Sequence, residues 1–139
     1  MENMLKRFLL GTTMIALVAS SAACGSTVTS PSLTYSYAFA SRLLEKGSAW
    51  RSIPVVEKGT MKVQLITADQ SVVYRLGVGT VNGTSCTLSQ TVDTAPNSTD
   101  GSPQITLTVA ANDNKCVLIQ DIGNLTTPGA FTITIYIET

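Results

Sequence analysis

Three cysteines and the complete absence of histidine set the limits on the chemistry of this 139-residue chain. Cys24 follows an apolar segment, whereas Cys86 and Cys116 lie 30 positions apart in the second half of the sequence. Without histidine the chain lacks every Ser-His-Asp or Cys-His catalytic pair and every histidine-ligated metal site. We therefore expect no enzymatic activity, and we expect the cysteines to have anchoring or structural roles.

The first 23 residues have the organisation of a secretory signal peptide. Lys6 and Arg7 form a short positive region, and residues 8–19 (FLLGTTMIALVA) form an apolar segment. This segment is too short to span a membrane, which needs about 20 apolar residues. Residues 1–23 are therefore predicted to direct export and to be removed.

The run at residues 21–24 (SAAC) resembles the bacterial lipobox, in which small residues precede a cysteine that is acylated and becomes the new N-terminus. Ser21 stands where that motif prefers leucine. The resemblance implies that Cys24 carries the lipid that anchors the protein. The alternative is ordinary signal-peptidase cleavage after Ala23, which leaves Cys24 as a free thiol.

The residues that follow Cys24 are typical of a tether. The segment 24–32 is small and polar, so it is predicted to be a flexible link between the lipid and a folded domain. Gly25, directly after the cysteine, resembles the sorting signal of outer-membrane lipoproteins. We therefore expect an exported protein anchored in the bacterial cell envelope, at the outer membrane or the surface, with free secretion as the alternative.

Cys86 and Cys116 are predicted to form a structural disulfide. Export places them under oxidising conditions, in which disulfides persist. Two cysteines without another ligand type nearby do not make a zinc site, and a catalytic thiol would lack its base. Closing a loop of about 30 residues stabilises a fold by roughly 3–4 kcal/mol in the chain-entropy model.

The composition favours β-structure and argues against nucleic acid as a partner. Twenty threonines and 14 serines stand beside 44% hydrophobic and only 13% charged residues, a composition typical of strands. Seven basic and eight acidic residues remain after residue 23, so the basic excess that phosphate binding needs is missing. No cofactor is expected.

Hydrophobic side chains recur with period two through most of the chain. Strands with one buried face are predicted at 33–40, 61–66, 105–109 and 131–137, and more fully buried central strands at 72–81 and 116–122. Asn82-Gly83 predicts a hairpin after the first of these central strands. The segment 41–45 (SRLLE) is the one stretch that suits a helical turn.

Turn residues separate these runs, and seven or eight short strands fit into about 105 residues. We therefore predict that residues 33–139 form a single antiparallel β-sandwich with an all-β fold. On this interpretation Cys86 and Cys116 lie on neighbouring or facing strands.

Three segments in order resemble the bacterial pre-peptidase C-terminal type of β-sandwich domain. They are 73–88 (VYRLGVGTVNGTSCTL), 114–122 (NKCVLIQDI) and 123–137, which begins GNLTTPGAFT. The family has a Leu-Gly-X-Gly-Thr strand, an Asn-Gly-Thr-X-Cys turn, a later Cys-Val strand with an aspartate, a Gly-Asn-Leu-Thr turn and a terminal Thr-rich strand. The similarity covers roughly residues 33–139.

This resemblance implies a jelly-roll-like sandwich that is not itself catalytic. Modules of this type bind collagen, polysaccharide or calcium in some proteins and act as spacers in others. This chain has no peptidase before the module, which follows the lipobox directly. A role as the removable end of a protease is therefore not expected.

Acidic and amide residues in the turns are candidates for calcium, which takes six to eight oxygen ligands. The best candidates are Asp113 and Asp121. Asn and Asp are also favoured in turns for their own hydrogen bonds, and that interpretation is the stronger one here.

Trp50 is the one large planar side chain outside an obvious alternating strand. One hypothesis is that it stacks on a polysaccharide or contacts a protein ligand, because tryptophan is enriched at binding sites. The other is that it covers the hydrophobic core.

Two further patterns are not expected to carry a reaction. The glycines at 77, 79 and 83 have the spacing G-x-G-x-x-x-G within a strand and hairpin, which indicates close backbone packing or a bulge, not a nucleotide loop. The acids Glu45, Glu57 and Glu138 have no spacing that predicts a glycosidase pair.

Two functional hypotheses follow from the sequence. The first is a non-catalytic envelope lipoprotein that acts as a binding or spacer module. The second is a structural subunit that assembles through edge strands, because residues 131–137 carry no charge and would pair with another chain if they formed an unprotected edge.

Overall fold

The structure, a computed structural model, describes residues 31–96 and 101–139. These residues form strands and turns, and none of them forms a helix long and apolar enough to cross a membrane. The strands are β1 (Thr34–Leu43), β2 (Ser48–Pro54), β3 (Gly59–Thr67), β4 (Tyr74–Asn82), β5 (Ser85–Thr94), β6 (Ile105–Val109), β7 (Asn114–Asp121) and β8 (Gly129–Glu138). The predicted signal peptide, Cys24 and most of the tether lie outside the described residues.

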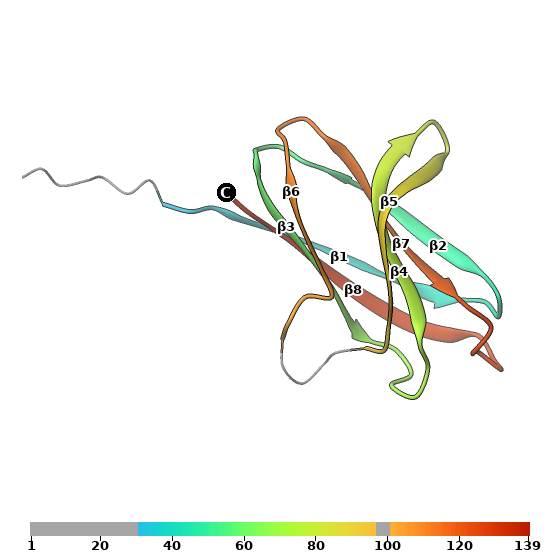
Figure 1. The fold of residues 1–139 in the computed structure, drawn as a ribbon. Helices are drawn as coiled ribbons and strands as arrows, with labels where there is room; N and C mark the ends of the chain where they lie inside the picture. The colour runs from blue at the N-terminus through green and yellow to red at the C-terminus, as the bar shows by residue number, and fades with distance from the viewer. Residues whose placement is uncertain (1–30, 97–100) are drawn as a thin grey trace, which may run out of the picture. The chain divides into compact units, whose positions relative to one another are not determined.

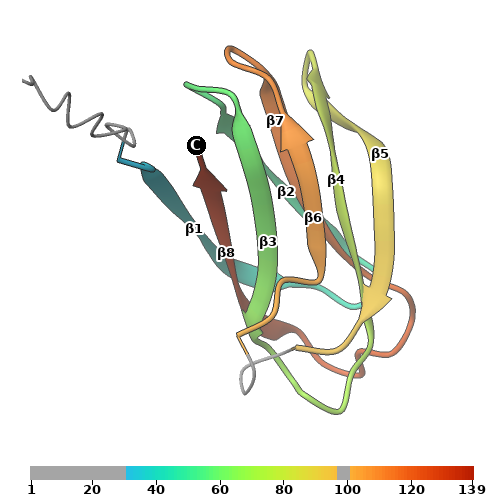
Figure 2. The same ribbon diagram turned by 60° about the vertical axis from the view of Figure 1, so that its left-hand side comes forward.

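Two four-stranded antiparallel sheets face each other (Figures 1 and 2). Sheet A has the strand order β1-β8-β3-β6, and sheet B has the order β2-β7-β4-β5. Every connection except the β4–β5 hairpin passes from one sheet to the other. This order is that of a jelly roll, so the predicted all-β antiparallel sandwich is confirmed.

The strands run between two ends of the sandwich, which we call the near end and the far end. At the near end β1 begins beside the end of β8, where the Thr139 amide donates a hydrogen bond to the Leu33 carbonyl at 3.0 Å. The far end holds the β1–β2 and β7–β8 turns. The ten residues of β1 separate the two ends by roughly 30 Å.

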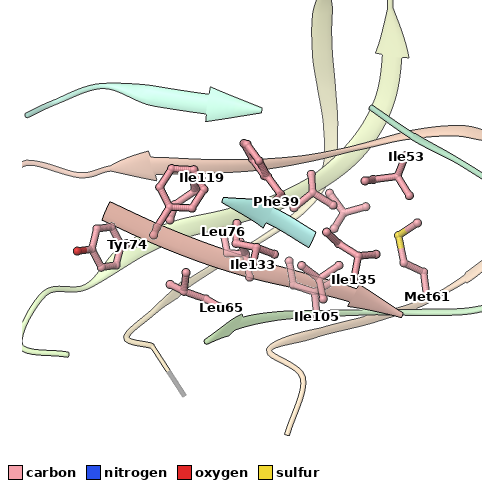
Figure 3. Close-up of a cluster of buried hydrophobic side chains, with 14 of the residues drawn as sticks. Phe39, Ile53, Met61, Leu65, Tyr74, Leu76, Ile105, Ile119, Ile133 and Ile135 are labelled. Carbon is pink, nitrogen blue, oxygen red and sulfur yellow. The ribbon is translucent and has the colours of Figure 1, made fainter. Parts of the chain in front are cut away.

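Inward-pointing side chains from both sheets fill the space between them. Figure 3 shows Ile133 and Ile135 of β8 packed among side chains of sheet A and of the facing strands. Phe39 and Phe131 meet edge to face with ring centroids 5.0 Å apart. Each fully buried isoleucine or leucine contributes roughly 1.5–3 kcal/mol relative to an exposed one, so the alternating pattern holds the sheets together.

The period-two pattern located most of the strands. The segments predicted to have one buried face lie in β1, β3, β6 and β8, and the two predicted central strands became β4 and β7. Both β4 and β7 are hydrogen-bonded to strands on either side. Continuous hydrophobicity therefore correctly indicated central strands.

Two local predictions were wrong. The segment 41–45 does not form a helical turn, because Ser41 to Leu43 continue β1 and bury Leu43 in the core. Trp50, which stood outside the predicted strands, lies in β2, and β2 pairs with β7 along its full length. In both places, pairing with a strand distant in the sequence outweighed the local conformational preference of the residues.

The terminal strand is not an edge. β8 pairs with β1 on one side and with β3 on the other, so its backbone groups are already satisfied within the sheet. The second functional hypothesis required residues 131–137 to pair with another chain as an edge strand. The position of β8 between two strands excludes that pairing.

The strands that do form edges carry features that hinder pairing with another chain. The Arg51 guanidinium of β2 donates to the Ala38 carbonyl on the free edge of β1 at 2.5 Å. β6 has only five residues, and β5 contains a bulge at Ser89, whose hydroxyl donates to the Val78 carbonyl.

Two glycines let β5 fold onto the outer face of β4. A Cβ atom at Gly79 would lie 1.9 Å from the Thr87 carbonyl oxygen, and one at Gly77 would lie 2.9 Å from the Leu88 side chain. The backbone of β5 and the Leu88 side chain therefore occupy the space that side chains on β4 would need. The close-packing interpretation of this glycine pattern is confirmed.

The same close approach allows the disulfide to form. Cys86 on β5 bonds to Cys116 on β7, and the two strands flank β4 in sheet B. The predicted bond is confirmed, but its strands are neither neighbours in the sheet nor in facing sheets. The Cα atoms are 5.8 Å apart, a reach across β4 that follows from the fold of β5 over Gly79.

The predicted hairpin is confirmed, with its turn moved by one position. Asn82 pairs with Ser85, so Gly83 and Thr84 are the central residues. Gly83 has φ of 60°, whereas Asn82 is not left-handed. Glycine at the first central position matches the preference of a type II′ turn.

Replacing Gly79 with alanine tests the role of the close approach. We expect Gly79→Ala to lower the free energy of unfolding by about 3 kcal/mol, because the added methyl group overlaps the backbone of Thr87. Gly129→Ala is the matched control, since its Cβ would meet only the Leu125 side chain at 3.6 Å. Its effect should stay within about 1 kcal/mol in urea unfolding. Equal stability of the two variants would contradict the proposed packing role.

Candidate functional site

A buried carboxylate organises the far end of the sandwich. Asp121, the last residue of β7, is only 2% exposed. Its Oδ1 atom accepts backbone N–H bonds from Gly123, Asn124 and Leu125, at 2.9–3.1 Å. Its Oδ2 atom accepts the Lys46 amide at 2.6 Å. One side chain thus links the β7–β8 turn to the β1–β2 turn.

Both turns connect one sheet to the other, so Asp121 holds two inter-sheet crossings in place. Its own amide also donates to the Gly47 carbonyl at 2.9 Å. Lys46 accommodates this geometry with φ of 53°, a left-handed conformation that is uncommon for a residue with a side chain. Backbone strain at Lys46 is therefore offset by the contacts of the β1–β2 turn with Asp121.

Hydrogen bonding determines the ionisation of this carboxyl group. Burial alone would raise the pKa of Asp121, but the N–H donors of Lys46, Leu125, Asn124 and Gly123 together hold it below its ordinary value. Donors that bind the charged form favour it. Asp121 is therefore a carboxylate at neutral pH, with its oxygens occupied by four backbone donors.

The Asp121 carboxylate and its turns form an open depression of about 460 Å³, which we call the Asp121 depression. It is lined by Lys46, Arg75, Gln120, Asp121, Ile122 and Gly123. Arg75 is held by Asp93 through two hydrogen bonds of 2.8 and 2.9 Å. This pairing raises the pKa of Arg75 and lowers that of Asp93.

Lys46 differs from Arg75 in its electrostatic surroundings. Within residues 31–96 and 101–139, no carboxylate lies within ion-pair distance of the Lys46 ammonium group. Exposed apolar side chains occupy the turns of the same end: Leu44 is 64% exposed and Ile122 is 39% exposed. The far end therefore combines an available cation with apolar surface.

A second depression, of about 350 Å³, lies on the outer face of sheet A, and we call it the Tyr136 depression. It is lined by Lys62, Gln64, Gly101, Pro103, Tyr136 and Glu138. Lys62 and Glu138 form an ion pair at 2.7 Å across β3 and β8.

The two aspartates proposed for calcium do not come together. Asp113 precedes β7 and Asp121 ends it, so the length of that strand separates them. Asp113 accepts the Ala110 amide at 3.1 Å and pairs with Lys115, which lowers its pKa. Among the described residues no cluster of three or more acidic or cysteine side chains surrounds either aspartate. The turn interpretation accounts for both.

Trp50 lies on the outer face of sheet B. It is half-buried beside Leu118, while its neighbours Ala49 and Ile53 point into the core. It does not cover the core between the sheets, and it lines neither depression. A ligand-binding role for Trp50 stays a prediction.

The three glutamates do not form a pair across a cleft. Glu45 lies in the β1–β2 turn at the far end, Glu57 lies at the near end beside Tyr35, and Glu138 is paired with Lys62. Neither depression contains two of them.

Sequence reasoning singled out Asp121, but for another role, and it missed Lys46, Arg75 and Tyr136. Lys46 had a detectable signal, since Lys-Gly between two strands predicts a turn. Nothing in the sequence indicated that this turn would meet the one after β7.

No protein-family model matches the chain, and no curated protein matches it. Among solved structures, it is similar to PliG from Aeromonas hydrophila, a periplasmic lysozyme inhibitor of g-type lysozyme. The two share 10% sequence identity with a TM-score of 0.50, over 76% of this chain and 88% of that chain. At this identity the likeness establishes a shared fold.

The role of Asp121 as a link between the turns gives a pH-dependent prediction. Its folded pKa is lowered, so its contribution to stability is present above the unfolded value near 3.9 and is lost as the pH falls through the folded value. We expect Asp121→Asn to lower the melting temperature at pH 7 by about 5 °C or more. The variant should also lose less stability than the wild type between pH 4 and pH 2.

Asp69→Asn is the control for this experiment. Asp69 also has a lowered pKa, but its hydrogen bonds to the Ser71 hydroxyl and amide lie in one exposed turn. Thermal unfolding followed by circular dichroism should show a smaller change for Asp69→Asn at both pH values. If the two variants behave alike, Asp121 does not hold the far end together.

Proposed function

We propose that the protein is a non-catalytic binding module of the bacterial cell envelope, held by an acylated Cys24, that binds a protein ligand with its far end. The observation that carries this proposal is the Asp121 depression, where Lys46 lies beside exposed apolar side chains on turns fixed by a buried carboxylate. Rigid turns reduce the entropy lost on binding.

The position of the predicted anchor supports this orientation. The tether of residues 24–32 leads to Leu33 at the near end. The far end lies roughly 30 Å away along β1. The Asp121 depression therefore lies at the end of the domain opposite the point where the tether joins it, so the tether does not cover it.

The chemistry of the depression favours a protein with an acidic patch. Interfaces combine an apolar centre with a polar rim. Ile122 lines the depression together with Lys46, and Leu44 adds exposed apolar surface on the β1–β2 turn. A carboxylate on the ligand would complement that cation. PliG, which has the same fold, is a periplasmic inhibitor of g-type lysozyme, which is itself a protein. We propose that the ligand of this chain is likewise a protein.

We assign the module to the pre-peptidase C-terminal type as part of the same proposal. The jelly-roll topology supports this assignment, and so do the roles of its resembling segments: the glycines of 73–88 admit β5, the two cysteines form a disulfide and Asp121 links the turns.

The anchor is tested by the intact mass of the mature protein extracted from membranes of its own cells. We expect a chain that begins at Cys24, carries acyl groups and has two hydrogens fewer for the Cys86–Cys116 bond. Cys24→Ser should prevent acylation. An unacylated wild-type chain found in the medium would contradict the anchor and leave Cys24 as a free thiol.

The ligand surface is tested by photo-crosslinking in intact cells. A photoreactive phenylalanine analogue at Ile122 should crosslink to a defined protein, and Lys46→Glu in the same chain should reduce the yield about tenfold or more. The same analogue at Val56, 58% exposed in the β2–β3 turn at the near end, is the control and should not capture that protein. The absence of a crosslink at Ile122, or equal capture at both positions, would contradict a ligand at the far end.

A further inference from the structure

The Tyr136 depression contains an aromatic ring on an otherwise small and polar sheet face. Tyr136 points outward from β8, which lies between β1 and β3 (Figure 2). Its partner on β1 is Ser36, and the next outward residue of β1 is Ala38. These short side chains leave the ring uncovered on that side.

The other side of the ring is lined by polar groups fixed in position. Lys62 is the register partner of Tyr136 on β3, and its ammonium group bonds both carboxylate oxygens of Glu138 at 2.8 and 2.7 Å. Gln64, only 7% exposed, follows on β3. Pro103 and Gly101 close the depression from the segment before β6.

These groups give the depression no net charge but both kinds of hydrogen-bonding capacity. Lys62 contributes donors and Glu138 contributes acceptors. An anionic ligand would be opposed by Glu138 and a cationic one by Lys62. The chemistry that fits is a neutral molecule with an apolar face for the ring and hydroxyl groups that both donate and accept.

We propose that the Tyr136 depression binds a neutral saccharide. A sugar ring presents C–H groups on one face, which pack on an aromatic ring, and hydroxyl groups around its rim. Tyr136 is the stacking residue, and Lys62 and Glu138 bind hydroxyl groups. The volume of about 350 Å³ accommodates one or two sugar rings. The site lies on a sheet face and not at the far end, so it is independent of the proposed protein ligand.

The test is a titration of the full mature chain with three neutral oligosaccharides: chitotetraose, cellotetraose and maltotetraose. Amide chemical shifts in two-dimensional NMR report both affinity and location. We expect at least one of the three to bind at up to millimolar concentration and to shift the amides of residues 62–64 and 134–138. If none of the three binds, or if the shifts lie elsewhere, the proposal is wrong.

Variants separate stacking from a general effect on the fold. Tyr136→Ala should weaken binding about tenfold or more, whereas Tyr136→Phe, which keeps the ring, should stay within about threefold. Ser36→Trp leaves Tyr136 in place but covers its ring, so it should also weaken binding, even if Tyr136→Ala proves unfolded. Val73→Ala, at an exposed position just before β4 of the other sheet, is the control and should leave the affinity unchanged. Unchanged affinity in Ser36→Trp, or loss of binding in Val73→Ala alone, would overturn the assignment.

Discussion

A single carboxylate fixes the end of this sandwich where its sheets must be joined. A jelly roll passes from sheet to sheet at almost every connection, and each crossing leaves backbone N–H groups without partners in a ladder. Asp121 accepts four of them, from the β1–β2 and β7–β8 turns. Because burial without donors would be costly for an ionised group, the carboxylate and the two turns require one another.

The division of labour in the fold follows from this arrangement. The inward faces of both sheets are buried in the hydrophobic core, so only the turns and the outer faces are accessible to a ligand. The far end has a cation and apolar side chains on turns that Asp121 holds, while sheet A has an aromatic ring beside the Lys62–Glu138 ion pair. The two surfaces therefore differ in chemistry, as do the protein and the saccharide that we propose as their ligands.

The close packing on the outer face of sheet B depends on two glycines and not on Asp121. Gly77 and Gly79 remove the side chains that would separate β5 from β4, and the disulfide then joins the strands on either side. The bulge at Ser89 lets β5 bend and makes it a poor template for another chain. The glycines thus allow the Cys86–Cys116 disulfide to form, and the close packing that they permit belongs to the same strand, β5, whose bulge hinders pairing with another chain.

The sequence by itself determined the strands whose two faces differ in polarity, because alternation is a local pattern. It also determined the β4–β5 hairpin from its turn residues, and the disulfide because Cys86 and Cys116 had only each other as partners in the exported domain. It did not determine that β8 is a central strand, since a charge-free strand reads the same in the middle of a sheet and at its edge. It marked Asp121 as a polar turn residue without revealing its partners. Those partners, Lys46 among them, lie up to 75 positions away. Only the tertiary structure decided which turns meet. Connections that cross between the sheets bring together turns that are far apart in the sequence, and no local pattern in the sequence predicts that contact.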